Sequence, residues 1–294
     1  MAKTLIDLIK ILRDRTGAGL MDCKTALLNN DSDLEKATDW LREKGLAKAA
    51  RNADRIAAEG LTVAKNCEKC GYTVILEVNC ETDFVAKGDL FHQLVDDVAE
   101  VILNKTPATV EEAKNLTADL FTDATVKMGE KFDLRRFELI NKTDDSFIYN
   151  YVHMGGKIAA AVVLDKEDGQ LGKGLAMHIA ANNPLYLTTA DIGAEAIDRE
   201  TKVQTEAAKN DEKLADKPEE MLKRIISGKV NKYFSEMVLA EQPYLMDVES
   251  NKKVGKILTE NKVKILKYVR YQVGEGIEKR QDDFACEVMS QIKK

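Results

Sequence analysis

The sequence lacks any long uninterrupted run of apolar residues, although 44% of its 294 residues are hydrophobic. No segment approaches the ~20 consecutive apolar residues that a membrane-spanning helix requires. The N-terminal stretch MAKTLIDLIKILRDR carries charges throughout, whereas a secretory signal has a continuous apolar block. We therefore expect a soluble, cytoplasmic protein without a membrane partner, and the length predicts about two domains.

An excess of positive charge is also absent. Lys and Arg together number 44 and Asp and Glu number 50, which gives a formal net charge of −6. A protein that binds a phosphate backbone needs a basic surface. We therefore expect no direct nucleic-acid partner.

Cysteines are few, and their number is odd. Five in a chain of this length do not resemble a disulfide framework. Cys67 and Cys70 form one CxxC, but a zinc site needs four ligands and no second pair follows. Gly71 favours a turn between two strands at this place. We expect no bound metal.

The common catalytic signatures are missing as well. The chain contains no GxGxxG after a strand, no GxxxxGK[ST] and no GxSxG, and its three histidines form no spaced metal pair. Cys80, Glu81 and His92 offer a nucleophile and a base for a thiol enzyme, yet Cys80 continues an apolar strand, where thiols are usually inert. His178 is better explained as a packed helix residue. We predict a protein that is not an enzyme and has no cofactor.

What the chain does contain is first a three-helix unit over residues 1–54, which ends in a linker. Apolar residues at helical spacing predict the first helix: Leu5, Leu8, Ile9 and Leu12. A second helix is expected over Met21–Leu28, and a third from Ser32, whose S-x-x-E motif is a capping box, to Gly45. The loop between the first two helices exposes Leu20 and Met21, which suit docking to a partner.

A pattern of two β-rich runs around glycines, a helix and a third strand then occurs twice. The first copy has runs within 61–84, a helix over about 82–103 and a strand over 133–140. The second has runs within 146–168, a helix over about 170–181 and a strand over 267–273. The pattern predicts an α+β fold with a duplicated core, in which helices cover one face of each small antiparallel sheet.

The domain boundaries follow from these patterns. We expect a core N-subdomain at 55–140 and a core C-subdomain formed by 141–190 and 229–282. Residues 191–228 are polar and helical, with Pro218 suited to the first turn of a returning helix, and predict an inserted antiparallel helical hairpin. Residues 283–294 are expected to form a C-terminal helical segment.

The stretch VNCETDFVAKGDLF places an acid and a large ring side by side at the start of a helix. Thr82 is a good N-cap, so Asp83 becomes the first helical residue, where the helix dipole favours a negative charge. Phe84 lies seven residues before Phe91 and would join the core if the helix were continuous. Gly88 makes that continuity uncertain, and the alternative is an exposed wedge. Spacing alone leaves both interpretations open.

Several long segments resemble the elongation factor Ts family. They are TGAGLMDCKTAL (16–27), EVNCETDFVAK (77–87), MHIAANNP (177–184), EQPY (241–244) and VGEGIEK (273–279). The resemblance covers nearly the whole chain in the same order. It implies a UBA-like N-terminal domain and a guanine-nucleotide exchange factor that binds elongation factor Tu, in its GDP-bound and nucleotide-free forms, during translation.

The resemblance also implies roles for three groups of residues. The segment that disturbs the partner's magnesium site would comprise Thr82, Asp83, Phe84 and Val85. The N-terminal unit would dock through Leu20 and Met21. The core C-subdomain would grip another domain of the partner through His153, Met154, Gly155 and Gly156. Ala159 stands where many relatives carry glycine, which is a departure close to that grip. The alternative function is a non-enzymatic adaptor or holdase that binds helices through the N-terminal unit.

Overall fold

The computed structural model describes residues 4–67, 69, 71–211, 214, 218–247 and 249–278. The fold is mixed helix and sheet, as the sequence predicts. It divides into two compact units. The first comprises residues 1–142, 152–159 and 271–294, and the second comprises 143–151 and 160–270. The expected helical segment at 283–294 lies outside the described residues.

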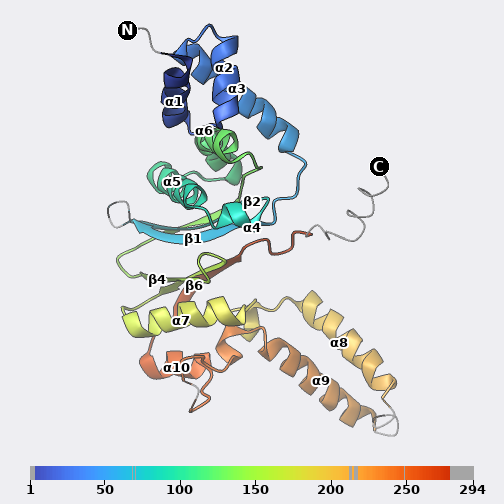
Figure 1. Ribbon diagram of the computed structural model, residues 1–294. Coiled ribbons are helices and arrows are strands. Elements are labelled where there is room, and N and C mark those ends of the chain that lie inside the picture. Colours follow the sequence, from blue (N-terminus) through green and yellow to red (C-terminus); the bar gives the residue numbers. More distant parts are fainter. Residues whose placement is uncertain are drawn as a thin grey trace. The chain divides into compact units, whose positions relative to one another are not determined.

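Three helices form the N-terminal region: α1 (Leu5–Thr16), α2 (Leu20–Asn29) and α3 (Leu34–Asn52) (Figure 1). A reciprocal capping box between Thr4 and Asp7 begins α1, and Gly17, in the left-handed conformation at φ 69°, ends it. Their shared core contains Leu12, Cys23, Leu27 and Leu41, all buried. The expected three-helix region is therefore present.

The predicted limits of α3 are wrong at both ends. The N-cap is Asp33, whose carboxylate accepts hydrogen bonds from two backbone N–H groups of the first turn, whereas Ser32 precedes it with φ 60°. Gly45 does not end the helix but lies buried within it. The helix α6 (Val110–Met128) packs so closely there that a Cβ atom on Gly45 would overlap Cγ2 of Val126. The glycine serves this close helix contact rather than a turn.

The first sheet contains β1 (Glu59–Cys67), β2 (Tyr72–Cys80) and β3 (Asp133–Asn141) in that order, and both pairs are antiparallel. β1 and β2 form the hairpin expected around Gly71, which has φ 70°. Cys67 is disulfide-bonded and Cys70 lies outside the described residues, so Cys67 offers no free thiolate for zinc. Among the described residues, no group of His, Cys, Asp and Glu could hold a metal ion.

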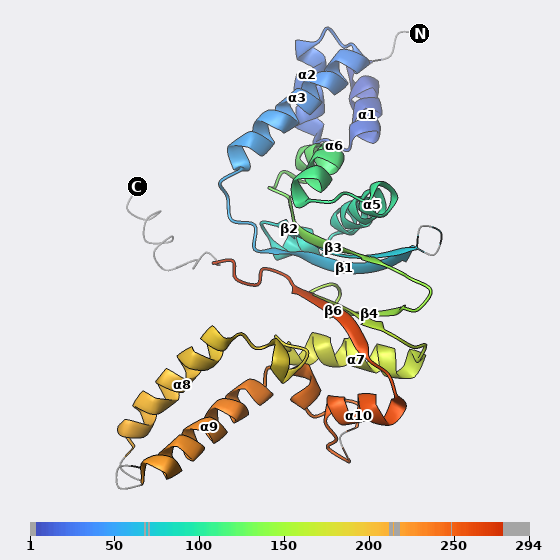
Figure 2. The same cartoon turned by 180° about the vertical axis from the view of Figure 1, so that it is seen from behind.

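Two helices cover one face of this sheet: α5 (Asp89–Lys105) and α6 (Figures 1 and 2). α5 carries an apolar stripe that includes Phe91, Val98 and Ile102, all fully buried against the strands. The helix expected over 82–103 is interrupted. A short helix, α4 (Asp83–Ala86), ends before Gly88, whose extended backbone is the N-cap of α5.

A second sheet contains β4 (Phe147–His153), β5 (Ile158–Leu164) and β6 (Ile265–Gln272), again in sequence order. The helix α7 (Gly169–Asn182) packs against it. The Tyr149 ring of β4 lies against Gly172, and the Arg270 side chain of β6 donates to the carbonyl of Ala180 at 3.1 Å. A further short helix, α10 (Val254–Asn261), precedes β6.

Two longer helices, α8 (Ala194–Lys209) and α9 (Glu219–Ser235), lie side by side in the second unit (Figure 1). They occur where the sequence predicts a hairpin, although α9 continues to Ser235, past the expected boundary at residue 228. Most residues of the tip between them lie outside the described part of the chain. No helix in the described ranges has the length and apolar character required to cross a membrane.

His178 joins two segments of the second unit. It is fully buried in α7, where its Nε2 lies 2.9 Å from Oε1 of Gln242 and its Nδ1 accepts the Leu245 N–H at 3.2 Å. This pattern requires the neutral ring with its proton on Nε2. His178 is thus a packed helix residue, as the sequence predicts.

Candidate partner-binding site

The strand-to-helix corner at Thr82 forms as the sequence predicts. β2 ends at Cys80, and the Thr82 hydroxyl accepts the Val85 N–H at 3.3 Å, which makes Thr82 the N-cap of α4. Asp83 is then the first helical residue, at the end of the dipole where an acid is favoured. Ala86 is buried and Val85 is half-buried against the core, so α4 rests on the sheet through its second half.

Phe84 points into solvent, with 84% of its surface exposed, while Phe91 is fully buried. The interruption at Gly88 explains the difference, because α4 and α5 do not share one helical register. The core interpretation of Phe84 is therefore wrong, and the exposed interpretation holds. An exposed ring of this size on an ordered corner is a typical anchor for a partner protein.

Asp83 is not a free acid. Its carboxylate accepts a hydrogen bond from the Lys87 ammonium at 2.6 Å, one helical turn away. This hydrogen bond lowers the pKa of Asp83, and the more distant charge of Lys157 lowers it further. Asp83 is therefore ionised at neutral pH, with a partner that a competing ligand could displace. Lys157 follows the turn between β4 and β5 and belongs to the first unit, as the corner does.

The thiol interpretation loses its support at the same corner. Cys80 is fully buried, and its Sγ donates to the carbonyl of Thr82 at 3.2 Å. Burial raises the pKa of Cys80 to about 12, so the thiol remains protonated at neutral pH and is a poor nucleophile. His92 lies on the exposed side of α5.

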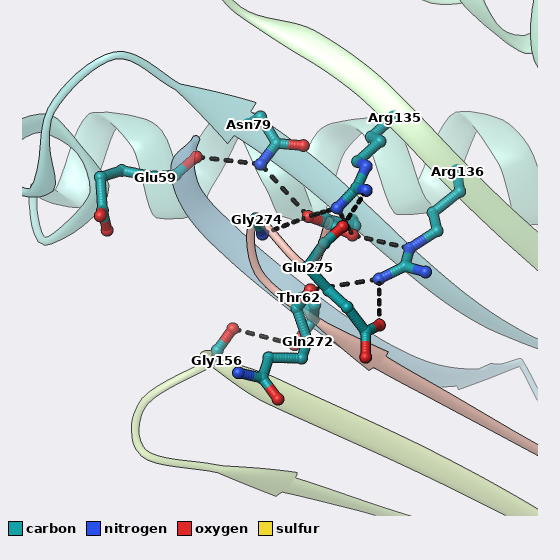
Figure 3. Close-up of polar contacts among 10 residues, drawn as sticks. Glu59, Thr62, Asn79, Arg135, Arg136, Gly156, Gln272, Gly274 and Glu275 are labelled. Atoms are coloured by element: carbon teal, nitrogen blue, oxygen red, sulfur yellow. Dashed lines mark hydrogen bonds and ion pairs between the residues drawn. The ribbon is translucent and has the colours of Figure 1, made fainter. Parts of the chain in front are cut away.

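The residues His153 to Gly156 form the turn between β4 and β5. Met154 is 70% exposed and has φ 49°, and the two glycines that follow also have positive φ. The carbonyl of Gly156 accepts both the backbone N–H of Thr62, at 2.6 Å, and its hydroxyl, at 2.9 Å (Figure 3). A Cβ atom at Gly156 would approach Leu61 to 2.8 Å. Glycine is needed there so that the turn can lie against β1.

A salt bridge fixes the end of this turn. The Lys157 ammonium lies 2.8 Å from the Glu59 carboxylate at the start of β1. The corner and the turn therefore both stand on β1, and each presents one exposed apolar side chain, Phe84 and Met154.

A buried carboxylate that sequence reasoning did not single out joins further segments to the first sheet. Glu77, in β2, is fully buried and pairs with Arg135 at 3.0 Å and Arg136 at 2.7 Å, both from β3. Figure 3 labels the two arginines. It also accepts the Gly274 N–H at 2.8 Å and an Asn79 amide N–H at 3.2 Å. Its full set of donors satisfies a charge that would otherwise be costly to bury.

Arg136 extends this cluster along the chain. Its guanidinium lies over the Tyr271 ring, 4.3 Å from the centroid, and donates to the Gln272 carbonyl at 3.1 Å and to the Glu275 carboxylate at 3.2 Å. The segment after β6 is thereby held against β3. The only sequence signal was that Glu77 and this segment belong to two of the stretches that resemble one family.

In the N-terminal region, Leu20 and Met21 are 52% and 65% exposed. They lie in the first turn of α2 rather than in the preceding loop. Cys23, two residues after Met21, is fully buried. The two exposed residues are thus presented by an ordered helix.

The comparison with protein families decides what these features belong to. The family model described as Elongation factor TS matches residues 81–275. The chain belongs to this family. Membership in the elongation factor Ts family gives it a function in translation elongation and protein biosynthesis. The matched range includes the corner at Thr82, the turn at Met154 and the segment at Gly274, whereas the N-terminal stretch 16–27 precedes it.

Proposed function

We propose that the protein is a guanine-nucleotide exchange factor that binds elongation factor Tu and promotes GDP release. The observation that carries this proposal is the exposed ring of Phe84 beside the ionised Asp83 on an ordered corner. Family membership supports the partner. In this role the protein makes and breaks no covalent bond and is not an enzyme of a chemical reaction.

The proposed mechanism is a competition between two ligands of one partner. Phe84 enters an apolar pocket of the nucleotide-binding domain, and Asp83 exchanges Lys87 for groups near the magnesium site. Displacement of magnesium removes the largest counter-charge of the nucleotide phosphates and weakens GDP binding. By linkage, the exchange factor and the nucleotide must weaken each other's binding by the same factor.

Two further patches complete the proposed contact. Leu20 and Met21 dock the N-terminal helices on the partner. The turn formed by His153, Met154, Gly155 and Gly156 contacts another of its domains. Several modest contacts on one chain bind more tightly than each alone, yet they can be released one after another when a new nucleotide binds. In this proposal the first sheet supports the corner and the second sheet provides the turn, in keeping with the proposed duplicated architecture.

The test is the release of labelled GDP from elongation factor Tu by the full chain. The doubly substituted variant Asp83→Ala, Phe84→Ala is expected to lose most of the acceleration, because both side chains act at the nucleotide site. Leu266→Ala is the matched control, since Leu266 is 54% exposed in β6. Unfolding curves must accompany the assay. Phe84 contributes little buried area, so the double variant should unfold within about 0.5 kcal/mol of the parent. A double variant as fast as the parent would falsify the proposal.

The adaptor alternative has one observation in its favour. α2 exposes Leu28, at 59%, in addition to Leu20 and Met21. A pull-down from a cell extract separates the two functions. One stoichiometric partner supports exchange, whereas many substoichiometric partners that are lost with Leu20→Ala, Met21→Ala support the adaptor.

A further inference from the structure

The corner that carries Phe84 includes α4, a helix that is too short to be stable by itself. α4 has four residues, and an isolated helical turn is unfavourable because nucleation fixes several residues for one hydrogen bond. Ala86 and Val85 anchor the second half of α4 in the core. The first half follows Glu81 and Thr82, which are half-buried and exposed, and it needs another support.

Glu130 provides that support from a distant part of the chain. One oxygen of its carboxylate accepts the backbone N–H groups of Glu81, at 3.0 Å, and Thr82, at 3.1 Å. The other oxygen accepts the Thr82 hydroxyl at 2.6 Å. Glu130 reaches the corner because α6 ends immediately before it, at Gly129, in the left-handed conformation at φ 81°.

The contact with the hydroxyl also controls the N-cap. The Thr82 hydroxyl has a single hydrogen, which it donates to Glu130. Its lone pairs are then left to accept the Val85 N–H, which is the capping bond of α4. Without the carboxylate, the hydroxyl would be free to rotate and the cap would weaken.

Hydrogen bonds run in both directions between the corner and the segment around Glu130. The Glu81 carboxylate accepts the Lys131 N–H at 2.7 Å. The Lys131 ammonium in turn donates to the carbonyls of Ala53, at 2.6 Å, and Arg55, at 2.9 Å, just after α3. The backbone at Glu81 and Thr82 is therefore tied to the ends of two helices.

We infer that Glu130 is a positioning residue, which fixes the backbone at Glu81 and Thr82 and thereby the direction in which Asp83 and Phe84 face the partner. This inference rests on the exchange function proposed above. It predicts that Glu130 affects the rate of nucleotide release without contacting the partner's nucleotide.

Three variants test it. Glu130→Ala removes all three hydrogen bonds, and Glu130→Gln keeps one acceptor oxygen. The matched control is Glu112→Ala, because the Glu112 carboxylate accepts the Ala108 N–H at 2.8 Å at the other end of α6. Glu130→Ala should lower the GDP release rate at saturating factor about tenfold, since small errors in placement are costly. Glu130→Gln should lie between it and the parent, and Glu112→Ala should match the parent.

Two further measurements separate positioning from general destabilisation. Amide hydrogen exchange should become faster at Glu81 and Thr82 in Glu130→Ala but not in Glu112→Ala. Adding Glu130→Ala to the Phe84→Ala variant should reduce release by less than twofold, because both changes act through one element.

The inference is overturned if Glu130→Ala loses amide protection but releases GDP like the parent, or if the two substitutions have independent effects on release. If the parent itself accelerates nothing, the proposed exchange function fails first. The amide exchange would then still report whether Glu130 holds the corner.

Discussion

At the scale of single residues, Phe84 contributes little to the stability of the fold. Full burial of such a side chain would contribute about 1.5–3 kcal/mol, and a ring that is 84% exposed forgoes most of it. Its neighbour Asp83 gains only an exposed ion pair with Lys87, which solvent screens. Stability of the fold therefore does not explain the exposed ring of Phe84, whereas burial by the proposed partner would.

His178 behaves in the opposite way, since its contacts serve the fold. Burial lowers its pKa, although the hydrogen bond to Gln242 acts in the other direction. The folded state therefore binds this proton less readily than the unfolded state, whose pKa is near 6.5. The stabilisation is fully present above pH 6.5 and is lost as the pH falls from there toward the lowered pKa of the folded state.

We predict a corresponding pH dependence of unfolding. Between pH 7.5 and pH 5.5, the free energy of unfolding of the parent should fall with a slope from His178 of up to about 1.4 kcal/mol per pH unit. Urea unfolding of the parent, His178→Asn and His92→Asn at both pH values measures it. The His92→Asn variant, which replaces an exposed histidine, is the control. A parent and a His178→Asn variant with equal slopes would contradict the assignment.

At the scale of elements, the sequence supports the existence of helices and strands better than it supports their ends. The apolar stripe of α5 and the β-rich runs of β1 and β2 are local periodic signals, and all three elements are present. Gly45 and Gly88 look alike in the sequence but act differently. Gly88 caps a helix, while Gly45 lets α6 approach α3. The second role depends on a residue about 80 positions away, which no local pattern can reveal.

Two glycines within helices allow a test of whether the role of a glycine depends on the residues packed against it. By propensity alone, Gly→Ala in a helix stabilises by about 1 kcal/mol. A methyl group added at Gly228 in α9 would meet no neighbouring atom within 4 Å, so Gly228→Ala should stabilise by about 0.5–1 kcal/mol. A Cβ atom at Gly172 in α7 would overlap the Tyr149 ring.

Gly172→Ala should therefore destabilise by about 1–3 kcal/mol despite the better helix propensity. Thermal and urea unfolding of both variants show whether each substitution raises or lowers the free energy of unfolding. Because Gly172 and Gly228 belong to the same compact unit, the comparison is made within one folded body. Two stabilised variants would show that the Tyr149 ring yields to the added methyl group.

At the scale of the whole molecule, the sequence predicted the corner at Thr82 but did not predict the contacts that hold it in place. The corner consists of consecutive residues, Thr82, Asp83 and Phe84. An N-cap at Thr82 and a possible break at Gly88 were therefore enough to define two alternatives for the Phe84 ring, buried or exposed. Apart from Asn79, the groups that Glu77 and Glu130 bind lie 48 to 197 positions away in the chain. Such contacts arise from strand pairing and helix packing, and they leave no spacing in the sequence.

The last prediction concerns the ion pairs and hydrogen bonds around Glu77. Glu77→Gln keeps the shape of the side chain but removes the charge that Arg135 and Arg136 share. Breaking a buried pair costs about 3–5 kcal/mol, and the arginines retain partial access to solvent, which places the expected loss near the lower value. The control is Glu100→Gln, because Glu100 pairs with Lys65 at 3.1 Å on the surface and should cost at most about 1 kcal/mol.

The segment after β6 should respond more strongly than the rest of the first unit. The Gly274 N–H donates directly to Glu77, and Arg136 holds the Gln272 carbonyl, so both bonds depend on the same carboxylate. Amide hydrogen exchange should become faster at Gly274 in Glu77→Gln and stay unchanged in Glu100→Gln. If Gly274 keeps its protection while unfolding shifts, the carboxylate stabilises the strands alone, and the attachment of this segment must come from Arg136 and Tyr271.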